Sequence, residues 1–137
     1  MATQQLTGTP LGAAYPATRL VPAVVSGAEV QIECPSWCTV DHTGKTGMWL
    51  EDLSHESDFI DLEATVVGKP DGLQLFARLG QDLVSSKAYR RQPFLVLDGG
   101  DDADDLTLDA ADEFADNLVA FAAQIRELTR AARGVSQ

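Results

Sequence analysis

Two cysteines and two histidines are the residues of this chain whose types and spacing indicate chemistry. The chain has no other cysteine or histidine, and these four fall in one short stretch, as Cys34, Cys38, His42 and His55. Tetrahedral zinc is commonly bound by two thiolates and two imidazoles that come from a short span of sequence. Two thiolates also neutralise the charge of the divalent ion. The sequence therefore predicts one structural zinc ion (Zn2+) bound by these four side chains.

The spacing of the first three candidate ligands suits one compact segment. Cys34, Cys38 and His42 follow one another at intervals of four residues, which places them along one side of a helical or turn-like stretch. We expect the two tryptophans, Trp37 and Trp49, to pack around the ion and exclude water. The interval differs from that of the usual zinc fingers, so the prediction depends mainly on the clustering of the four residues.

Other arrangements of the same residues stay open at this point. A Cys34–Cys38 disulfide would close a very short loop, would stabilise the fold by about 2 kcal/mol, and would suit a secreted protein. The thiols could instead be free and buried, with the histidines unrelated to them at the surface. Iron–sulfur clusters usually need four thiolates, or two cysteines and two histidines in another arrangement. Ligand type alone does not separate zinc from iron or cobalt.

The same ligand set bears on catalysis. If both histidines bind the metal, no histidine remains to act as a general base. Four protein ligands also close the coordination sphere, which is typical of structural zinc. We therefore expect a non-enzymatic protein-interaction module. A metal-dependent hydrolase is the alternative if one of the four residues does not bind the ion and water takes its place.

The charge of the chain limits its partners. The formal net charge is −11 and the pI is near 4.3. Such a surface repels phosphates, which argues against direct nucleic-acid binding and against binding to anionic membranes. The expected partner is a protein whose identity the sequence does not give. An acidic decoy or inhibitor of a basic DNA-binding protein is a further alternative.

The first residues and the apolar runs bear on location. The opening stretch, MATQQLTGTP, lacks the basic and apolar regions of a signal peptide. Apolar runs all fall short of the roughly 20 residues needed to cross a bilayer. Two cysteines in a reducing compartment fit a metal site better than a disulfide framework. We therefore expect a cytoplasmic protein.

A small antiparallel sheet is predicted to position the candidate ligands. Alternating or compactly apolar runs predict strands at residues 28–33, 59–67, 73–79 and 93–97. Residues 69–72, Lys-Pro-Asp-Gly, predict the turn of a hairpin, and residues 98–105 predict an acidic loop. Residues 34–58 have no clean period, so we expect an irregular segment in which a bound metal replaces regular secondary structure.

A long amphipathic helix over residues 107–132 is the most regular pattern. Its apolar side chains recur at alternating intervals of three and four residues: Ala111, Phe114, Leu118, Phe121, Ile125, Leu128 and Ala132. Thr107 can cap the start and Gly134 can end the helix. At 1.5 Å per residue it would be about 39 Å long. Because this is long for so small a domain, we expect part of it to overhang or to form a homodimer with a second copy.

These elements predict a single zinc-stabilised domain of the α+β class. Its sheet of three to four strands would be packed by the C-terminal helix in two layers, and the domain would cover residues 28–133. Residues 1–27 are rich in Thr, Ala, Pro and Gly, with prolines at positions 10, 16 and 22. That composition predicts a flexible N-terminal tail.

The motif CPSWC at residues 34–38, followed by His42 and His55, resembles a family of small actinobacterial proteins that carry a domain of unknown function. Members of that family look like CPxWC, a histidine shortly after it, and a second histidine about a dozen residues further on. Strands and an acidic helix follow. The resemblance covers residues 28–132, although the family's Leu-Thr-Pro helix start is replaced here by Leu-Thr-Leu at residues 106–108. It supports the four ligands as a set and implies no activity.

Overall fold

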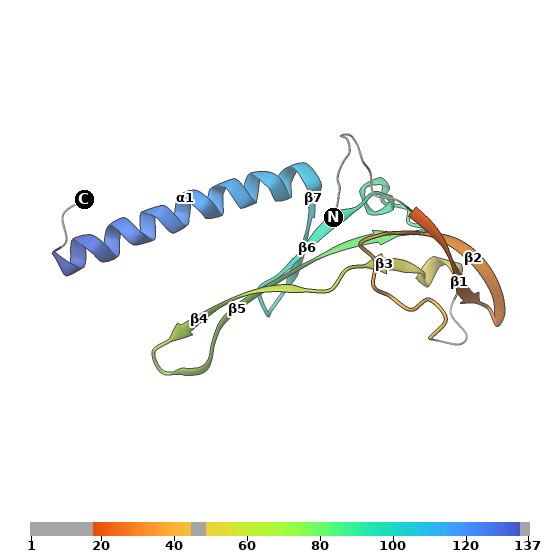
Figure 1. The fold of residues 1–137 in the computed structure, drawn as a ribbon, viewed down its shortest axis with the longest axis horizontal. Coiled ribbons are helices and arrows are strands. Elements are labelled where there is room, and N and C mark those ends of the chain that lie inside the picture. Colours follow the sequence, from red (N-terminus) through yellow and green to blue (C-terminus); the bar gives the residue numbers. More distant parts are fainter. Residues whose placement is uncertain (1–17, 45–48, 135–137) are drawn as a thin grey trace.

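The computed structural model describes residues 18–44 and 49–134 as an α+β fold (Figure 1). Its antiparallel strands form a two-stranded sheet and a five-stranded sheet, and one long helix follows them, which confirms the predicted class. The elements are β1 (Thr18–Val25), β2 (Ala28–Pro35), η1 (Leu50–Asp52), β3 (Ser54–Glu56), β4 (Ile60–Val66), β5 (Lys69–Asp82), η2 (Ala88–Arg91), β6 (Phe94–Asp98), β7 (Ala103–Thr107) and α1 (Leu108–Arg133).

The smaller sheet is a hairpin of β1 and β2, paired along their full lengths. Its tight turn holds Ser26 and Gly27 at positive φ values of 51° and 82°, the geometry that suits the twist of a two-residue hairpin. The prediction of a flexible tail over residues 1–27 is therefore wrong for residues 18–27, which form β1 and the turn after it, and residues 1–17 lie outside the described part of the chain. Pro22, which suggested irregular structure, lies in β1 because an edge strand tolerates a residue without an N–H group.

The larger sheet is organised around β5, a strand of 14 residues. β3 pairs with the end of β5, β4 pairs with its beginning, and β6 and β7 follow on its other side. The β4–β5 turn lies at Val67 and Gly68, two residues before the predicted turn. A bulge between Ala64 and Val66 shifts the register. Gly72, with φ of 67°, faces it, and a Cβ there would collide with the Ala64 carbonyl oxygen.

The edge strand β7 differs from the loop predicted for residues 98–105. It contains Asp104 and Asp105, yet it pairs with β6 from Phe94 to Asp98. Charged residues are common on edge strands because one side of the strand faces solvent and the charge discourages further pairing. Arg90 of η2 fastens this edge, with its guanidinium 2.7 Å from a carboxylate oxygen of Asp82 and 2.6 Å from one of Asp105.

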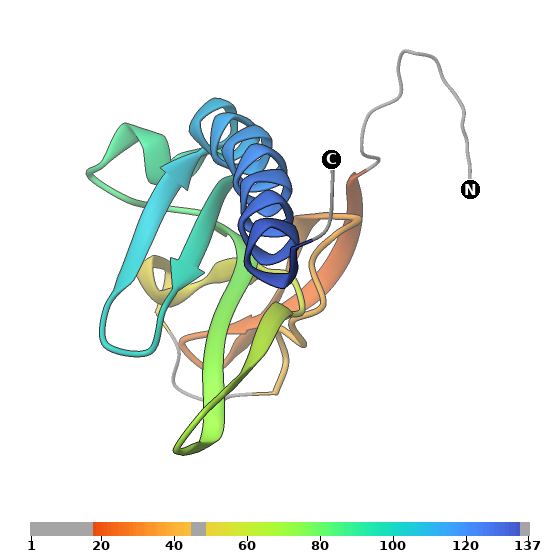
Figure 2. The same cartoon turned by 90° about the vertical axis from the view of Figure 1, so that its left-hand side faces the viewer.

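The helix α1 begins and ends as predicted. The Thr107 hydroxyl accepts a hydrogen bond of 3.2 Å from the Ala110 N–H, and Gly134 ends the helix in the left-handed conformation with φ of 77°. None of its 26 residues is buried. Figures 1 and 2 show α1 running away from the end of the molecule that holds β1 and β2. The helix therefore covers the sheet only with its first turns and overhangs it for the rest, rather than packing along it.

The buried apolar residues gather at the other end of the molecule. Ala23 of β1, Ile32 of β2 and Leu53 form a cluster between the smaller sheet and β3. Phe94 of β6 is buried outside this cluster. It packs over Gly80, where a Cβ would lie 3.1 Å from the ring. The Ala23 cluster lies in the region from which the candidate ligands come.

Candidate metal centre

Four candidate ligands come from three places in the chain that the fold brings together. Cys34 is next to last in β2, Cys38 and His42 lie in the loop that follows, and His55 is the central residue of β3. We call residues 36–44 the ligand loop. Because β2 belongs to one sheet and β3 to the other, the four side chains join the two sheets.

Backbone hydrogen bonds hold the ligand loop in place. The Cys38 N–H donates to the Pro35 carbonyl at 3.1 Å and closes the CPSWC turn. The Thr39 N–H donates to the Glu56 carbonyl of β3 at 2.9 Å, and the Val24 N–H of β1 donates to the His42 carbonyl at 3.1 Å. The loop is therefore fastened to both sheets although it has no regular secondary structure. The predicted turn-like arrangement applies to the stretch from Pro35 to Cys38.

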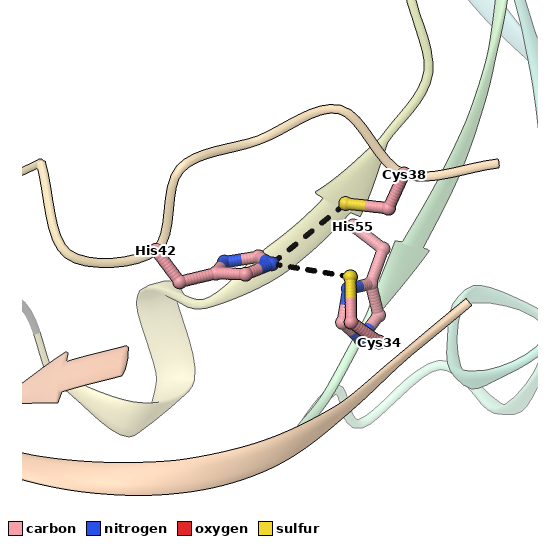
Figure 3. A group of neighbouring side chains, drawn as sticks. All are labelled: Cys34, Cys38, His42 and His55. Carbon is pink, nitrogen blue, oxygen red and sulfur yellow. Dashed lines mark hydrogen bonds between the residues drawn. The ribbon is translucent and has the colours of Figure 1, made fainter. Parts of the chain in front are cut away.

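The side chains converge on one point (Figure 3). The His42 Nε2 atom lies 3.8 Å from the Cys34 Sγ atom and 3.7 Å from the Cys38 Sγ atom. One ligand atom from each of the four residues lies within 4.8 Å of the others. Zinc–sulfur and zinc–nitrogen bonds at a tetrahedral angle place sulfur and nitrogen about 3.6 Å apart. The cluster is thus compatible with a single metal ion.

Burial sets the protonation of the cluster. All four residues are buried, with at most 6% of any one exposed. Burial raises the pKa of the Cys34 thiol to about 11, and the neighbouring Cys38 adds to the shift. Burial also lowers the pKa of His42 and of His55. The imidazoles are therefore neutral at pH 7, which is the form that binds metal, whereas a Cys34 thiolate needs a nearby cation.

One polar atom of the cluster has no partner in the described residues. The Nδ1 atom of His55 is buried and makes no hydrogen bond to any of them. Such an atom is costly unless a ligand occupies it. The ring of His42 stands perpendicular to that of His55, with centroids 5.2 Å apart, so the two rings approach from different directions. The orphaned nitrogen and the perpendicular rings both fit a tetrahedral ion.

The tryptophans behave differently from each other. Trp37 is half-buried and packs edge-on against the His55 ring, with centroids 6.4 Å apart. This contact shields one side of the cluster, as predicted. Trp49 is 61% exposed and packs against none of the four ligands, so the expectation that both tryptophans surround the site is wrong. Leu53, two residues before His55 in the chain, is fully buried and packs with Ala23 and Ile32.

The structure contradicts two alternatives for the same residues. Both cysteines are free thiols, so the structure has no Cys34–Cys38 disulfide. The histidines are buried beside the thiols rather than at the surface, so the reading of unrelated surface histidines is wrong. The fold thus brings together the same four residues that the sequence predicted as ligands.

A cavity beside His42 was not predicted from the sequence. It has a volume of about 160 Å³ and carries three carboxylates in its lining, those of Asp41, Asp52 and Glu56. Asp41 accepts hydrogen bonds from Thr43, which hold its pKa below the usual range. Glu56 is paired with Arg78 at 3.2 Å. Both carboxylates are thus already engaged by neighbouring polar groups, which makes them poor candidates for a general acid.

Comparison with known proteins gives one result at the level of family. A family model described as "Domain of unknown function (DUF6907)" matches residues 18–134, from the start of β1 to the C-cap of α1. Neither the search of curated proteins nor that of solved structures found a match. Within residues 18–44 and 49–134, no helix is long and apolar enough to cross a membrane.

Proposed function

This chain belongs to the DUF6907 family, a domain of unknown function, and we propose that it is a non-enzymatic protein-interaction module stabilised by one structural zinc ion. The observation that carries the proposal is the closure of the site. Four buried side chains supply two sulfur and two nitrogen atoms around one point. Structural zinc sites are closed in this way, whereas catalytic sites keep one position for water or substrate.

Zinc is the ion that this donor set favours. Two thiolates and two imidazoles suit a tetrahedral, borderline-soft cation, and the two thiolates cancel its charge inside a buried site. Binding would also lower the pKa of Cys34, because a thiolate bound to zinc no longer requires the proton that burial favours. Iron and cobalt accept the same donors, so the metal content of the purified protein decides between them.

The positions of the ligands support a structural role. The four ligands join β2, the ligand loop and β3, and within the described part of the chain the apolar cluster beside them has Ala23, Ile32 and Leu53 as its buried members. So small a core contributes little free energy of unfolding. Structural zinc contributes roughly 10–16 kcal/mol of apparent binding free energy in zinc-finger peptides. We therefore assign the joining of the two sheets mainly to the metal.

Native mass spectrometry and thermal unfolding test this proposal together. We expect one zinc per chain, and loss of cooperative unfolding after chelation. Cys38→Ala should lose both the zinc and the cooperative transition. Ser36→Ala is the matched control, because Ser36 lies in the same turn with an exposed side chain, and it should keep both. A metal-free Cys38→Ala protein that still unfolds cooperatively near the wild-type temperature would contradict the proposal.

A metal-dependent hydrolase is the second candidate, favoured by the cavity beside His42. That cavity gives solvent a route to one side of the cluster. Its carboxylates are already engaged: Asp41 accepts from Thr43, Glu56 pairs with Arg78, and Asp52 accepts from the Trp49 N–H at 3.4 Å. Substitution with cobalt distinguishes the two, because its visible spectrum reports coordination number. A four-coordinate spectrum with two thiolates supports the structural role, and a five-coordinate spectrum with bound water supports the hydrolase.

The acidic corner formed by β7 and the start of α1 favours a basic partner as a third candidate. Asp104 and Asp109 are exposed there, whereas Asp105 is engaged by Arg90 and Tyr89. An acidic decoy would bind a basic protein through such a surface, and its affinity would fall steeply with salt. A pull-down in which the recovered partners are not basic, or stay bound at high salt, counts against the decoy.

A further inference from the structure

The apolar stripe of α1 faces solvent over most of its length. Phe121 and Leu128 are 58% and 71% exposed, and Leu118 and Ile125 lie on the same stripe with more than a third of each exposed. An apolar stripe on a helix normally faces a core or another chain. Contiguous exposed apolar patches larger than a few hundred Å² mark interaction sites in soluble proteins.

The stripe continues into a groove between the first turns of α1 and the sheet. The groove has a volume of about 220 Å³ and its lining is almost entirely apolar. From the helix it takes Phe114 and Leu118, and from the sheet it takes Ile60, Leu62 and Leu75. Ile60 and Leu62 belong to the face of β4 that the alternating pattern predicted to be half-buried, yet 71% and 60% of these residues are exposed. We call the apolar stripe of α1 and this groove together the apolar face.

The domain cannot cover this face with its own helix. β7 ends at Thr107 and α1 begins at Leu108, so no linker separates them. The Thr107 cap fixes the direction in which the helix leaves the strand. Because the helix is continuous from Leu108 to Arg133, its outer half cannot turn back over β4 without breaking.

The flanks of the stripe suit a second helix. Ala115, Asn117, Ala122 and Gln124 border it and carry no charge. Small neutral residues at these positions let two helices approach closely without opposing charges between them. The charged residues of α1, among them Asp112 and Arg130, lie further round the helix and stay in water.

The charges of α1 specify the direction of pairing. Its first half carries Asp109, Asp112, Glu113 and Asp116, and its last half carries Arg126, Arg130 and Arg133 with one acidic residue, Glu127. Parallel pairing would put both acidic halves, with eight carboxylates, at the same end of the dimer, and a chain of net charge −11 disfavours that concentration of charge. In the antiparallel arrangement each acidic half lies alongside a basic half, which favours this direction through longer-range attraction without direct contact, and the two helix dipoles point in opposite directions.

We infer that a second copy of this chain covers the apolar face, in a two-fold dimer whose α1 helices run antiparallel. The outer half of each helix, with Leu128, would enter the groove of the other copy beside Ile60 and Leu62. A two-fold axis makes every contact twice, so one self-complementary surface closes the assembly. The inference deepens the interaction-module part of the proposed function and does not depend on the identity of the metal.

Sedimentation velocity and light scattering on the zinc-loaded full chain test the inference. We expect twice the chain mass of 14.7 kDa at micromolar concentrations. Leu128→Glu and Phe121→Glu should each raise the dissociation constant about 100-fold or more, because two anchors are lost per dimer. Glutamate is a good helix former, so circular dichroism should show an intact helix. Val119→Glu is the matched control, since Val119 is 73% exposed on the other side of α1, and it should leave the dimer unchanged.

Cysteine cross-linking tests the direction. Antiparallel helices bring opposite ends together. A mixture of Ala111→Cys chains and Ala132→Cys chains should therefore form a disulfide between the two variants. Chains that all carry Ala132→Cys should form no disulfide with one another. Disulfide-linked Ala132→Cys homodimers would overturn the antiparallel arrangement. A chain that lacks residues 1–17 should remain dimeric. If removal of residues 1–17 instead turns a monomer into a dimer, that segment is the occupant and the inference is overturned.

The outcomes separate this inference from the proposed function. A zinc-loaded, folded chain that stays monomeric at all concentrations overturns the dimer, and leaves a zinc-stabilised module with a foreign partner. A Leu128→Glu protein whose mass in solution equals that of the wild type also overturns the dimer. A chain that folds without metal overturns the structural-zinc proposal, whatever its mass.

Discussion

The ligand loop and the helix α1 are ordered by opposite means. The loop has no regular secondary structure, but its ligands Cys38 and His42 are buried and its backbone is hydrogen-bonded to both sheets. The helix has 26 regular residues and both caps, yet none of its side chains is buried. Local sequence thus determines the helix, whereas the loop depends on groups that come from elsewhere. Regular secondary structure and burial are therefore separate properties of this molecule, and experiments can perturb one without the other.

Chelation of the metal should have the largest effect and should fall on the loop first. Removing a structural zinc forfeits roughly 10–16 kcal/mol of apparent binding free energy. We expect fast amide exchange at Cys38 and Thr39, whose N–H groups are bonded to Pro35 and Glu56, together with loss of cooperative unfolding. The exchange of amides in the middle of α1 is the internal control. If Cys38 and Thr39 stay as protected after chelation as before, the loop does not depend on a metal.

Truncation of the largest buried side chain outside the metal region should have the next largest effect. Phe94 is 2% exposed, packs on Gly80 and lies under the guanidinium of Arg90 at 4.7 Å. Phe94→Ala should therefore lower the free energy of unfolding by about 3–5 kcal/mol, as measured by urea unfolding. Phe59→Ala is the control, since half of Phe59 is exposed, and it should cost about half as much as Phe94→Ala.

Zinc retention separates the two regions in the same experiment. Phe94→Ala should keep one zinc per chain in native conditions, because Phe94 packs against Gly80, Tyr89 and Arg90, which are not ligands. Loss of zinc from folded Phe94→Ala protein would show that the sheet and the ligand loop are coupled more tightly than their separate contacts indicate.

Acid should weaken the loop and leave the helix nearly unaffected. Burial lowers the pKa of His42 and of His55 below the usual value of 6.5. A group with a lowered folded-state pKa stabilises the fold above the unfolded pKa and loses that contribution as the pH falls. Stability and metal retention should therefore drop below about pH 6.5, by up to about 1.4 kcal/mol per histidine for each pH unit. Zinc release measured with a colorimetric chelator should show this direction, and release that increases towards pH 8 would contradict it.

Removal of the helix cap should have the smallest effect. The Thr107 hydroxyl accepts from the Ala110 N–H, so Thr107→Ala should cost about 1 kcal/mol. Thr129→Ala is the matched control, because the Thr129 hydroxyl only donates to the Arg126 carbonyl within the exposed helix, and it should be close to neutral. Thermal unfolding measures both. An equal loss for both variants would mean that the direction of α1 is set by something other than the cap.

The sequence predicted best what depends on neighbours in the chain. The α1 boundaries were predicted to within one residue because the apolar period, Thr107 and Gly134 are all local signals. The four candidate ligands were identified because the chain holds no other cysteine or histidine. The strand β4 was also predicted, since Ile60, Leu62 and Ala64 alternate with polar residues.

What the sequence did not predict depends on partners far away in the chain. β1 pairs with β2 although it contains Pro22, and β7 pairs with β6 although it contains two adjacent aspartates. In both strands, pairing with the neighbouring strand outweighs the low β-propensity of proline or aspartate. No pattern within the segment itself reveals that neighbouring strand. The exposure of Ile60 was missed for a similar reason. Alternation shows which side chains share a face but not whether anything covers it.

The direct junction between β7 and α1 also has a mechanical consequence. A rigid helix of 26 residues that leaves a strand without a linker behaves as a lever whose pivot is Thr107. At 1.5 Å per residue its arm is about 39 Å, so a rotation of about 10° at the pivot moves the far end by about 7 Å. A small change of twist in β7, at the edge where Arg90 pairs with Asp105, would therefore produce a large displacement at Gly134.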